Sequence, residues 1–296
     1  MPMQRVESSD GVSVALHDLG GRGPALLISH ATGFNAHSYL PMAEALAGRF
    51  RSFGLDFRGH GDTPAPPGWE VDWRRYGDDA SAAAHAVAPD GGLIGFGHSM
   101  GGSALLMAAH RDPSLFELII AFEPIASIPD GWISLSTGPP PITDDPDHPL
   151  LTTMVEAARR RRRSFASYQD AIDNYGSKPP MAAFTPEALR NYVEHGFAPS
   201  ADGVTLRCNP ELEAQTFLNG RINGVWDLLP EITTPVLLVI GEAEDVGPAS
   251  IGEEMARRLP NGTFRGFPHL DHMAPFTHPS EVADLVAGAR AVVAPE

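Results

Sequence analysis

The sequence predicts an α/β fold in which helices flank a mostly parallel central sheet and a helical lid is inserted. Short apolar or β-branched runs alternate with helix-like segments over most of the 296 residues. One such run leads directly into Gly97-His98-Ser99-Met100-Gly101, which a further helix-like segment follows. The alternation stops between about residues 128 and 224, which predicts an insertion rather than more sheet.

Seven segments are predicted as strands, and turn residues or helix-like segments separate them. They cover residues 12–16, 25–29, 53–56, 93–96, 118–122, 235–240 and 263–267. Helices are expected at residues 39–46, 76–87, 103–110, 251–259 and 281–292. This order assigns residues 1–127 and 225–296 to one core domain and residues 128–224 to a helical lid.

The charge balance and the single cysteine exclude several classes of protein. With 37 acidic and 21 basic residues, the net charge is −16, which disfavours nucleic acid and anionic membranes as partners. Cys208 stands alone, and no Cys and His pattern has the spacing of a zinc site. The polar N-terminus lacks a signal-peptide core, and no apolar run approaches the ~20 residues that span a bilayer. We therefore expect a cytoplasmic protein that uses no metal or cofactor.

Ser99 stands in the pattern Gly-x-Ser-x-Gly, between a predicted strand and a predicted helix. On such a tight turn the serine hydroxyl projects above the sheet, and Gly97 and Gly101 keep Cβ atoms out of the crowded backbone. The turn also places Ser99 at a helix N-terminus, where the free N–H of Met100 can stabilise an oxyanion. We interpret Ser99 as a nucleophile and His98 as a packing or supporting residue.

Four motifs, found in this order, give the chain a resemblance to the α/β-hydrolase superfamily along nearly its whole length outside the insertion. They are His30-Ala31-Thr32-Gly33-Phe34, Asp56-Phe57-Arg58-Gly59-His60-Gly61-Asp62-Thr63, the Ser99 pentapeptide, and His272 followed by Pro279. The first is similar to an oxyanion loop, which implies that the N–H of Thr32 holds an oxyanion, although Ala31 stands where glycine is usual. The alternative is a tight connection without a chemical role. We assign the second motif no chemistry and expect its charges to fix a loop.

A serine hydroxyl needs a histidine to take its proton, and that histidine needs an acid to hold its tautomer. The resemblance places the histidine in the loop before the last helix. His272 fits because Pro279 and the predicted helix at 281–292 follow it. His269 and His278 lie in the same stretch and are interpreted as loop residues. His272 is therefore the predicted base.

Three carboxylates compete for the role of the acid. Glu244 occupies the place that the resemblance implies after the insertion, between Gly241 and Pro248, and Asp245 is its neighbour. Glu123 occupies a second place used in the superfamily, at the end of the strand that follows the nucleophile helix. A carboxylate that ends a buried apolar strand is costly unless it is hydrogen-bonded, which favours a catalytic role for Glu123. Its alternative role is to anchor the start of the lid. We rank Glu123 first, Glu244 second and Asp245 third.

These residues predict hydrolysis of a small, apolar carboxylic ester through an acyl-enzyme intermediate. A lactonase, a C–C bond hydrolase or an acyltransferase would use the same residues, and a non-catalytic small-molecule receptor is the alternative from another class. Five successive arginines at residues 159–163 lie in a helix-like stretch, 155–175, of the lid. Either they form a solvated face paired with Glu156 and Asp170, or one of them points into the pocket and holds a carboxylate. The oligomeric state stays open.

Overall fold

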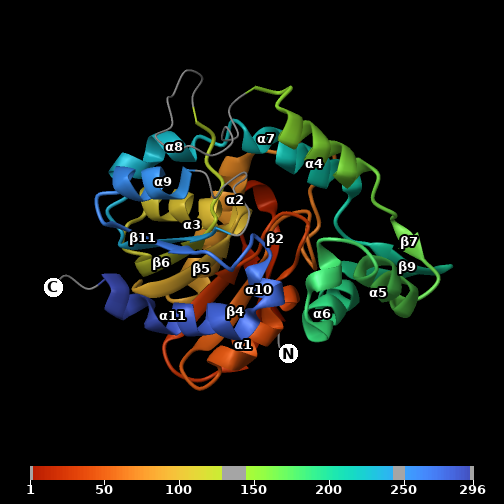
Figure 1. Ribbon diagram of the computed structural model, residues 1–296, viewed down its shortest axis with the longest axis horizontal. Helices are drawn as coiled ribbons and strands as arrows, with labels where there is room; N and C mark the ends of the chain where they lie inside the picture. The colour runs from red at the N-terminus through yellow and green to blue at the C-terminus, as the bar shows by residue number, and fades with distance from the viewer. Residues whose placement is uncertain (1–2, 129–144, 243–250, 294–296) are drawn as a thin grey trace.

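The computed structural model describes residues 3–128, 145–242 and 251–293, and its centre is an eight-stranded sheet (Figure 1). The strand order is β1-β2-β4-β3-β5-β6-β10-β11. Their bounds are β1 (Met3–Glu7), β2 (Ser13–Gly21), β3 (Ala25–Ser29), β4 (Arg51–Asp56), β5 (Leu93–His98), β6 (Phe116–Phe122), β10 (Val236–Gly241) and β11 (Gly262–Phe267). Strand β2 is antiparallel to β1 and β4, and the other neighbouring pairs are parallel, which confirms the predicted sheet.

Helices cover both faces of this sheet (Figure 1). One face carries α2 (Trp73–Val87), α3 (Met100–Arg111), α8 (Val225–Leu228) and α9 (Gly252–Arg258), and the other carries α1 (Leu40–Leu46), α10 (Ala274–Thr277) and α11 (Pro279–Val293). Side chains of a buried strand alternate between the two cores, so that Leu27 of β3 packs on the first face while Leu26 and Ile28 pack on the second. Each of these buried side chains contributes roughly 1.5–3 kcal/mol to folding. None of the helices that the structure describes is long and apolar enough to span a bilayer.

Every strand and helix predicted outside the insertion is present, with ends shifted by a few residues. Strand β1 was not predicted from the sequence. Its residues pair with β2 at the edge of the sheet, and four of the five are exposed. An edge strand with this much solvent contact needs no hydrophobic alternation, so its sequence gives no signal of period two.

Between β6 and β10 the described chain leaves the central sheet and forms an insertion. Its helices include α4 (Pro149–Arg159), α5 (Tyr168–Gly176), α6 (Pro186–Gly196) and α7 (Pro210–Gly220). The short strands β7 (Ser164–Phe165), β8 (Phe197–Ser200) and β9 (Gly203–Leu206) form an antiparallel sheet in the order β7-β9-β8. The insertion therefore contains the expected helices and also short strands that the sequence did not predict, because strands of two to four residues are too short to show a period. Residues 129–144 of the predicted lid lie outside the described residues.

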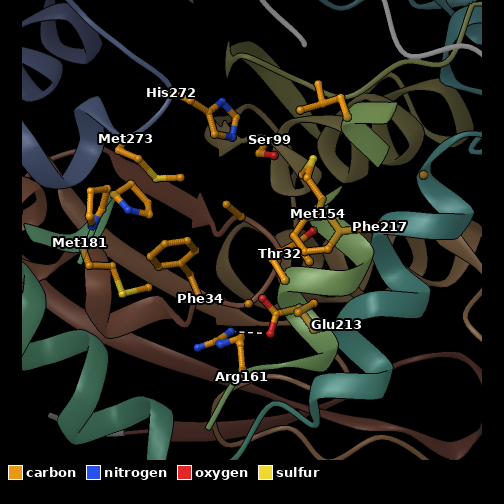
Figure 2. Close-up of a pocket in the computed structure, with 18 of the residues that line it drawn as sticks. Thr32, Phe34, Ser99, Met154, Arg161, Met181, Glu213, Phe217, His272 and Met273 are labelled. Atoms are coloured by element: carbon orange, nitrogen blue, oxygen red, sulfur yellow. Dashed lines mark hydrogen bonds and ion pairs between the residues drawn. The ribbon is translucent and has the colours of Figure 1, made fainter. Parts of the chain in front are cut away.

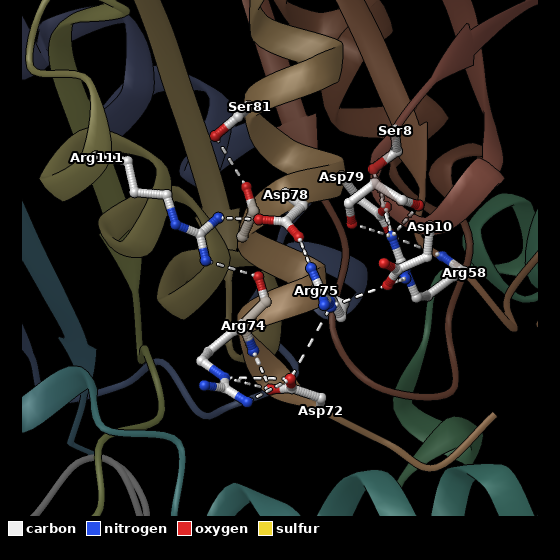
Figure 3. Close-up of polar contacts among 12 residues, drawn as sticks. Ser8, Asp10, Arg58, Asp72, Arg74, Arg75, Asp78, Asp79, Ser81 and Arg111 are labelled. Carbon is white, nitrogen blue, oxygen red and sulfur yellow. Dashed lines mark hydrogen bonds and ion pairs between the residues drawn. The ribbon is translucent and has the colours of Figure 1, made fainter.

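The loop after β4 is fixed by the fully buried side chain of Arg58 (Figure 3). Its Nε and Nη2 donate to the two carboxylate oxygens of Asp79 at 3.0 and 2.7 Å, and Nη2 also donates to Ser8 Oγ at 3.3 Å. A buried charge needs such partners, because removal from water is costly. In the same loop, Asp56 accepts the backbone N–H groups of Ala36 and Asp62, each at 2.8 Å. The charges of this motif hold a loop, as the sequence predicted.

Candidate active site

The sheet topology gathers the predicted site residues at one edge. The carboxyl ends of neighbouring parallel strands lie together, and loops at such an edge are where α/β proteins place their ligands. The loop with Thr32 follows β3, Ser99 follows β5 and Glu123 follows β6. His272 lies beyond β11, just before α10.

Ser99 forms the sharp turn between β5 and α3. Its φ of 55° and ψ of −120° are strained for a residue with a Cβ atom. The Ser99 N–H donates to the carbonyl of Phe122 at 2.9 Å, which ties the turn to β6. The side chain is buried and lines the pocket described below. The strained turn thus presents the hydroxyl to a cavity at the N-terminus of α3.

The two flanking glycines are required by close backbone contacts. A Cβ atom on Gly101 would lie 2.1 Å from the carbonyl oxygen of Ser29, and one on Gly97 would lie 2.5 Å from Gly102 Cα. Because both obstacles are backbone atoms, neither can move aside cheaply. The glycines therefore allow α3 to start hard against β3, as the motif predicted.

His272 and Glu123 are joined by a hydrogen bond. His272 Nδ1 donates to Glu123 Oε2 at 2.6 Å, and the second oxygen, Oε1, accepts the N–H of Gly241 at 2.8 Å. Glu123 lies at the end of β6 with a positive φ of 45°. Its side chain is buried, with the residue 2% exposed, so the carboxylate is shielded from water. With Nδ1 engaged, Nε2 of His272 is the nitrogen left for Ser99. Figure 2 shows the ring of His272 beside Ser99.

The competing acids and histidines differ in what the structure describes of them. Glu123, the first-ranked acid, contacts His272, and the other two, Glu244 and Asp245, lie outside the described residues. His269 is exposed and bonded to Glu281 at 2.7 Å, and the exposed His278 bonds to Thr277 at 2.8 Å. Both histidines are thus held in loop contacts, as expected.

Of the two predicted oxyanion donors, Met100 follows Ser99 directly in the chain and Thr32 belongs to the loop after β3. Met100 begins α3, and the first N–H groups of a helix have no partner within it. Thr32 lines the same pocket from the loop after β3. His30 shapes this loop: its Nε2 accepts the N–H of Phe57 at 3.1 Å, so Nδ1 donates to the carbonyl of Ala31 at 2.7 Å. Burial lowers the pKa of His30, which keeps the ring neutral in this bridging tautomer.

Tyr39 connects the predicted oxyanion loop to His98 in the turn at Ser99, a contact that the sequence did not predict. Its hydroxyl accepts the N–H of Ala31 at 3.0 Å and donates to His98 Nδ1 at 2.7 Å. Burial, together with the neighbouring His272, lowers the pKa of His98 well below its ordinary value, so this ring is neutral. The His98 ring centroid lies 4.8 Å from that of His272. His98 therefore packs against His272 and is hydrogen-bonded to Tyr39.

A cavity of about 810 Å³ extends from Ser99 and His272 (Figure 2). Its wall contains both core and insertion residues, and much of it is apolar. The apolar lining includes Phe34, Ile125, Leu150, Leu151, Met154, Met181, Phe217 and Met273. Cavities of this size hold small molecules.

The arginine run does not lie on one helix. Helix α4 ends at Arg159, and α5 begins only at Tyr168, where Ser167 caps it by accepting the N–H of Asp170. The predicted pair with Glu156 is present, made by Arg160 at 3.1 Å. The predicted pairing with Asp170 was wrong, because that carboxylate accepts the Ser167 hydroxyl.

Arg161 differs from Arg159 in its burial and in its position at the cavity. Its side chain is 14% exposed, lines the cavity and forms an ion pair with Glu213 of α7 (Figure 2). Arg159, in contrast, is exposed and paired with Glu211 at 3.0 Å. Arg159 thus fits the interpretation of a solvated face, whereas Arg161 lies at the pocket, as the alternative interpretation expected for one arginine.

One cluster among the described residues has the spacing of metal ligands. It consists of His17, Asp56 and Asp62. His17 Nε2 is hydrogen-bonded to Asp56 at 2.8 Å, and Asp62 pairs with Arg207 at 2.9 Å. These contacts already account for the side chains, and we assign no ion to them.

Comparisons with known proteins agree with this architecture. The sequence pattern of the alpha/beta hydrolase family matches residues 25–285. A 2-(acetamidomethylene)succinate hydrolase of Mesorhizobium japonicum is 27% identical over 262 residues, covering 85% of this chain and 82% of that protein. A pimeloyl-[acyl-carrier protein] methyl ester esterase of Methylococcus capsulatus is 22% identical over 271 residues, covering 91% and 95%. The crystal structure of an E-2-(acetamidomethylene)succinate hydrolase superposes with a TM-score of 0.74 and 21% identity, covering 97% of this chain and 98% of that one. These matches confirm the predicted fold class.

Proposed function

Because this chain belongs to the alpha/beta hydrolase family, we propose that it is a serine hydrolase that cleaves a small carboxylic ester through an acyl-enzyme intermediate. The family and the similar proteins identify the chain as a hydrolase, whereas the nucleophile, the ester and the intermediate are our proposal. The observation that carries the proposal is the 2.6 Å bond from His272 Nδ1 to the buried Glu123, with Ser99 beside the ring.

In the first half of the reaction, Ser99 Oγ attacks the ester carbonyl while His272 Nε2 takes its proton. Glu123 stabilises the imidazolium that forms and keeps the ring in one orientation. The N–H groups of Met100 and Thr32 hold the negative oxygen of the tetrahedral intermediate. One such donor contributes about 10²–10³ in rate. The intermediate collapses when the C–O bond breaks and His272 gives its proton to the departing alcohol.

In the second half, a water molecule attacks the acyl-enzyme while His272 takes a proton from it. Collapse of the second tetrahedral intermediate returns the proton to Ser99 Oγ and releases the acid. We further propose that the insertion acts as a lid, with residues of α4 and α7 among those that line the cavity. A lid of this kind limits access of water to the acyl-enzyme.

The choice of an ester is supported by one of the similar proteins, which is named for a methyl ester. The other is named as a hydrolase of 2-(acetamidomethylene)succinate. A panel of alkyl esters of graded acyl length, with lactones and a C–C cleavage substrate included, tests the bond that is cleaved. Turnover of lactones or of the C–C substrate, with no ester cleaved, would contradict the proposal.

Labelling with a fluorophosphonate tests the nucleophile directly. We expect the wild-type protein to be labelled and the Ser99→Ala variant to lose both labelling and ester turnover. Ser200→Ala, at an exposed serine of β8, is the matched control and should keep both. Unchanged labelling of Ser99→Ala would overturn the assignment. Labelling of the wild-type protein without turnover of any substrate in the panel would favour the receptor interpretation.

A further inference from the structure

The wall of the cavity changes character with distance from Ser99. Figure 2 shows Ser99 and His272 at one end and the ion pair of Arg161 with Glu213 at the other, with Thr32 and Phe34 between them. The intervening lining is largely apolar. A ligand that fills this space therefore meets a hydrocarbon-like middle and a charged far end.

The far end is rich in hydrogen-bond donors. Arg161 Nη1 donates to Glu213, and Nη2 donates to the hydroxyls of Tyr175 and Tyr192. Burial raises the pKa of Tyr192, so its hydroxyl keeps its proton. Within the described ranges, neither tyrosine hydroxyl has an acceptor for its own hydrogen. Tyr175 lines the cavity together with Arg161, so its O–H is a donor available to a ligand.

The charged residues of the cavity wall also favour an anionic ligand. The cavity lining holds five cationic side chains, Arg160, Arg161, Arg162, Lys178 and Arg221, and three carboxylates, Glu123, Glu213 and Asp271. Glu123 is engaged by His272 and Glu213 by Arg161, while Arg160 is paired with Glu156 outside the lining. In the part of the chain that the structure describes, Arg162 and Lys178 have no carboxylate within ion-pair distance. A positive wall in a protein of net charge −16 attracts an anionic ligand.

We propose that Arg161 and Tyr175 receive a carboxylate that the substrate carries at a distance from the scissile ester. This inference rests on the proposed function and names its substrate class, half-esters of acids with a hydrocarbon spacer. Glu213 and Tyr192 hold the guanidinium in place, while its remaining N–H groups and the Tyr175 O–H bind the carboxylate. An ammonium group at this position would meet Arg161 and its excess of donors, which disfavours a cationic substrate.

Matched ester pairs test the preference. Monoethyl adipate and ethyl hexanoate have acyl parts of the same length and differ in a terminal carboxylate or methyl group. The acetate ester of ω-hydroxyvalerate and pentyl acetate place the same difference in the alcohol part. We expect kcat/KM to be at least about tenfold higher for the acid member of one pair, because hydrogen bonds to charged groups are strong. The pair that shows the preference identifies the part of the substrate that carries the carboxylate.

Variants then locate the preference. Replacing both ion-pair partners, Arg161→Met with Glu213→Gln, avoids leaving one buried charge alone, and Tyr175→Phe removes a single donor. In both variants we expect the ratio of acid-ester to neutral-ester kcat/KM to fall, by about tenfold or more in the double variant. Arg159→Met, next to the site but exposed and outside the cavity lining, is the control and should keep the ratio.

The outcomes distinguish the two proposals. If the wild-type protein hydrolyses acid and neutral esters at equal rates, the carboxylate subsite is wrong and the serine hydrolase proposal stands. A ratio that is unchanged in the double variant, or that changes only in Arg162→Met or Lys178→Met, also rejects the assignment to Arg161. Failure to cleave any ester would instead count against the proposed function.

Discussion

Glu123 Oε2 lies 2.6 Å from His272 Nδ1, although the two residues are 149 positions apart in the sequence. The same carboxylate accepts the N–H of Gly241, so both oxygens are held by neighbours from separate segments. A buried carboxylate with two fixed partners is suited to orient an imidazole and to stabilise its protonated form.

We predict that Glu123→Gln lowers kcat about 10³–10⁴-fold, because the amide cannot stabilise the imidazolium or hold the reactive tautomer. The measurement is the steady-state turnover of an ester that the wild-type protein cleaves, with circular dichroism to check the fold. Glu244→Gln and Asp245→Asn are the controls and should keep kcat within about threefold. A large loss in either control, with Glu123→Gln still active, would reassign the acid.

Tyr39→Phe should lower kcat about tenfold and leave KM nearly unchanged, because the Ala31 N–H loses its acceptor and the oxyanion loop is less well positioned. Tyr76→Phe is the matched control: Tyr76 is also fully buried, and its hydroxyl bonds to Thr216 at 2.9 Å outside the cavity lining. Each variant should lower the free energy of unfolding by about 1–3 kcal/mol. Equal effects of the two variants on kcat would show that Tyr39 contributes to stability alone.

Gly101→Ala should reduce the free energy of unfolding by about 3 kcal/mol, because the new Cβ would lie 2.1 Å from the Ser29 carbonyl oxygen. Gly288→Ala, in α11, places a Cβ with nothing within 4 Å and should stabilise by about 0.5–1 kcal/mol. Urea denaturation measures both. A neutral effect of Gly101→Ala would contradict the close approach of α3 to β3.

Stability should fall as the pH drops below about 6.5. The pKa of His37 is lowered to about 3, first by burial and then by His195 and His17, and burial followed by His30 lowers that of His60 to about 3. In the unfolded chain both rings titrate near 6.5, so between pH 6.5 and 3 the unfolded state binds protons that the folded state does not. At pH 5 each ring therefore lowers the free energy of unfolding by about 2 kcal/mol. Above the unfolded pKa the ring has no such effect.

The effect is measured as the change in unfolding free energy between pH 7.5 and pH 5, for the wild-type protein and His37→Phe. We expect the change to be about 2 kcal/mol smaller in the variant. His85→Gln, at a histidine whose side chain is 55% exposed, should leave the change as it is in the wild-type protein. An identical pH dependence in all three proteins would show that His37 does not resist protonation in the fold.

The features that the sequence determined are those set by short stretches of chain. Ser99 needs a strand before it, a helix after it and glycines two residues away, and all of these lie within one local segment. The strands of the central sheet are likewise local runs of apolar residues that alternate with helices. Strand β1 and the small sheet of the insertion were not predicted, because exposed or very short strands show no run or alternation of apolar residues.

The features that only the tertiary structure decided are contacts between distant segments. Glu123 was one of three candidates, and its bond to His272 depends on how β6 and the loop after β11 meet. No sequence motif marks Tyr39 or the ion pair of Arg161 with Glu213. Their contacts are made with residues that are distant in the chain, so neighbouring residues give no signal for them. Local sequence therefore determined where the proposed nucleophile, Ser99, stands, and long-range packing decided which groups surround it.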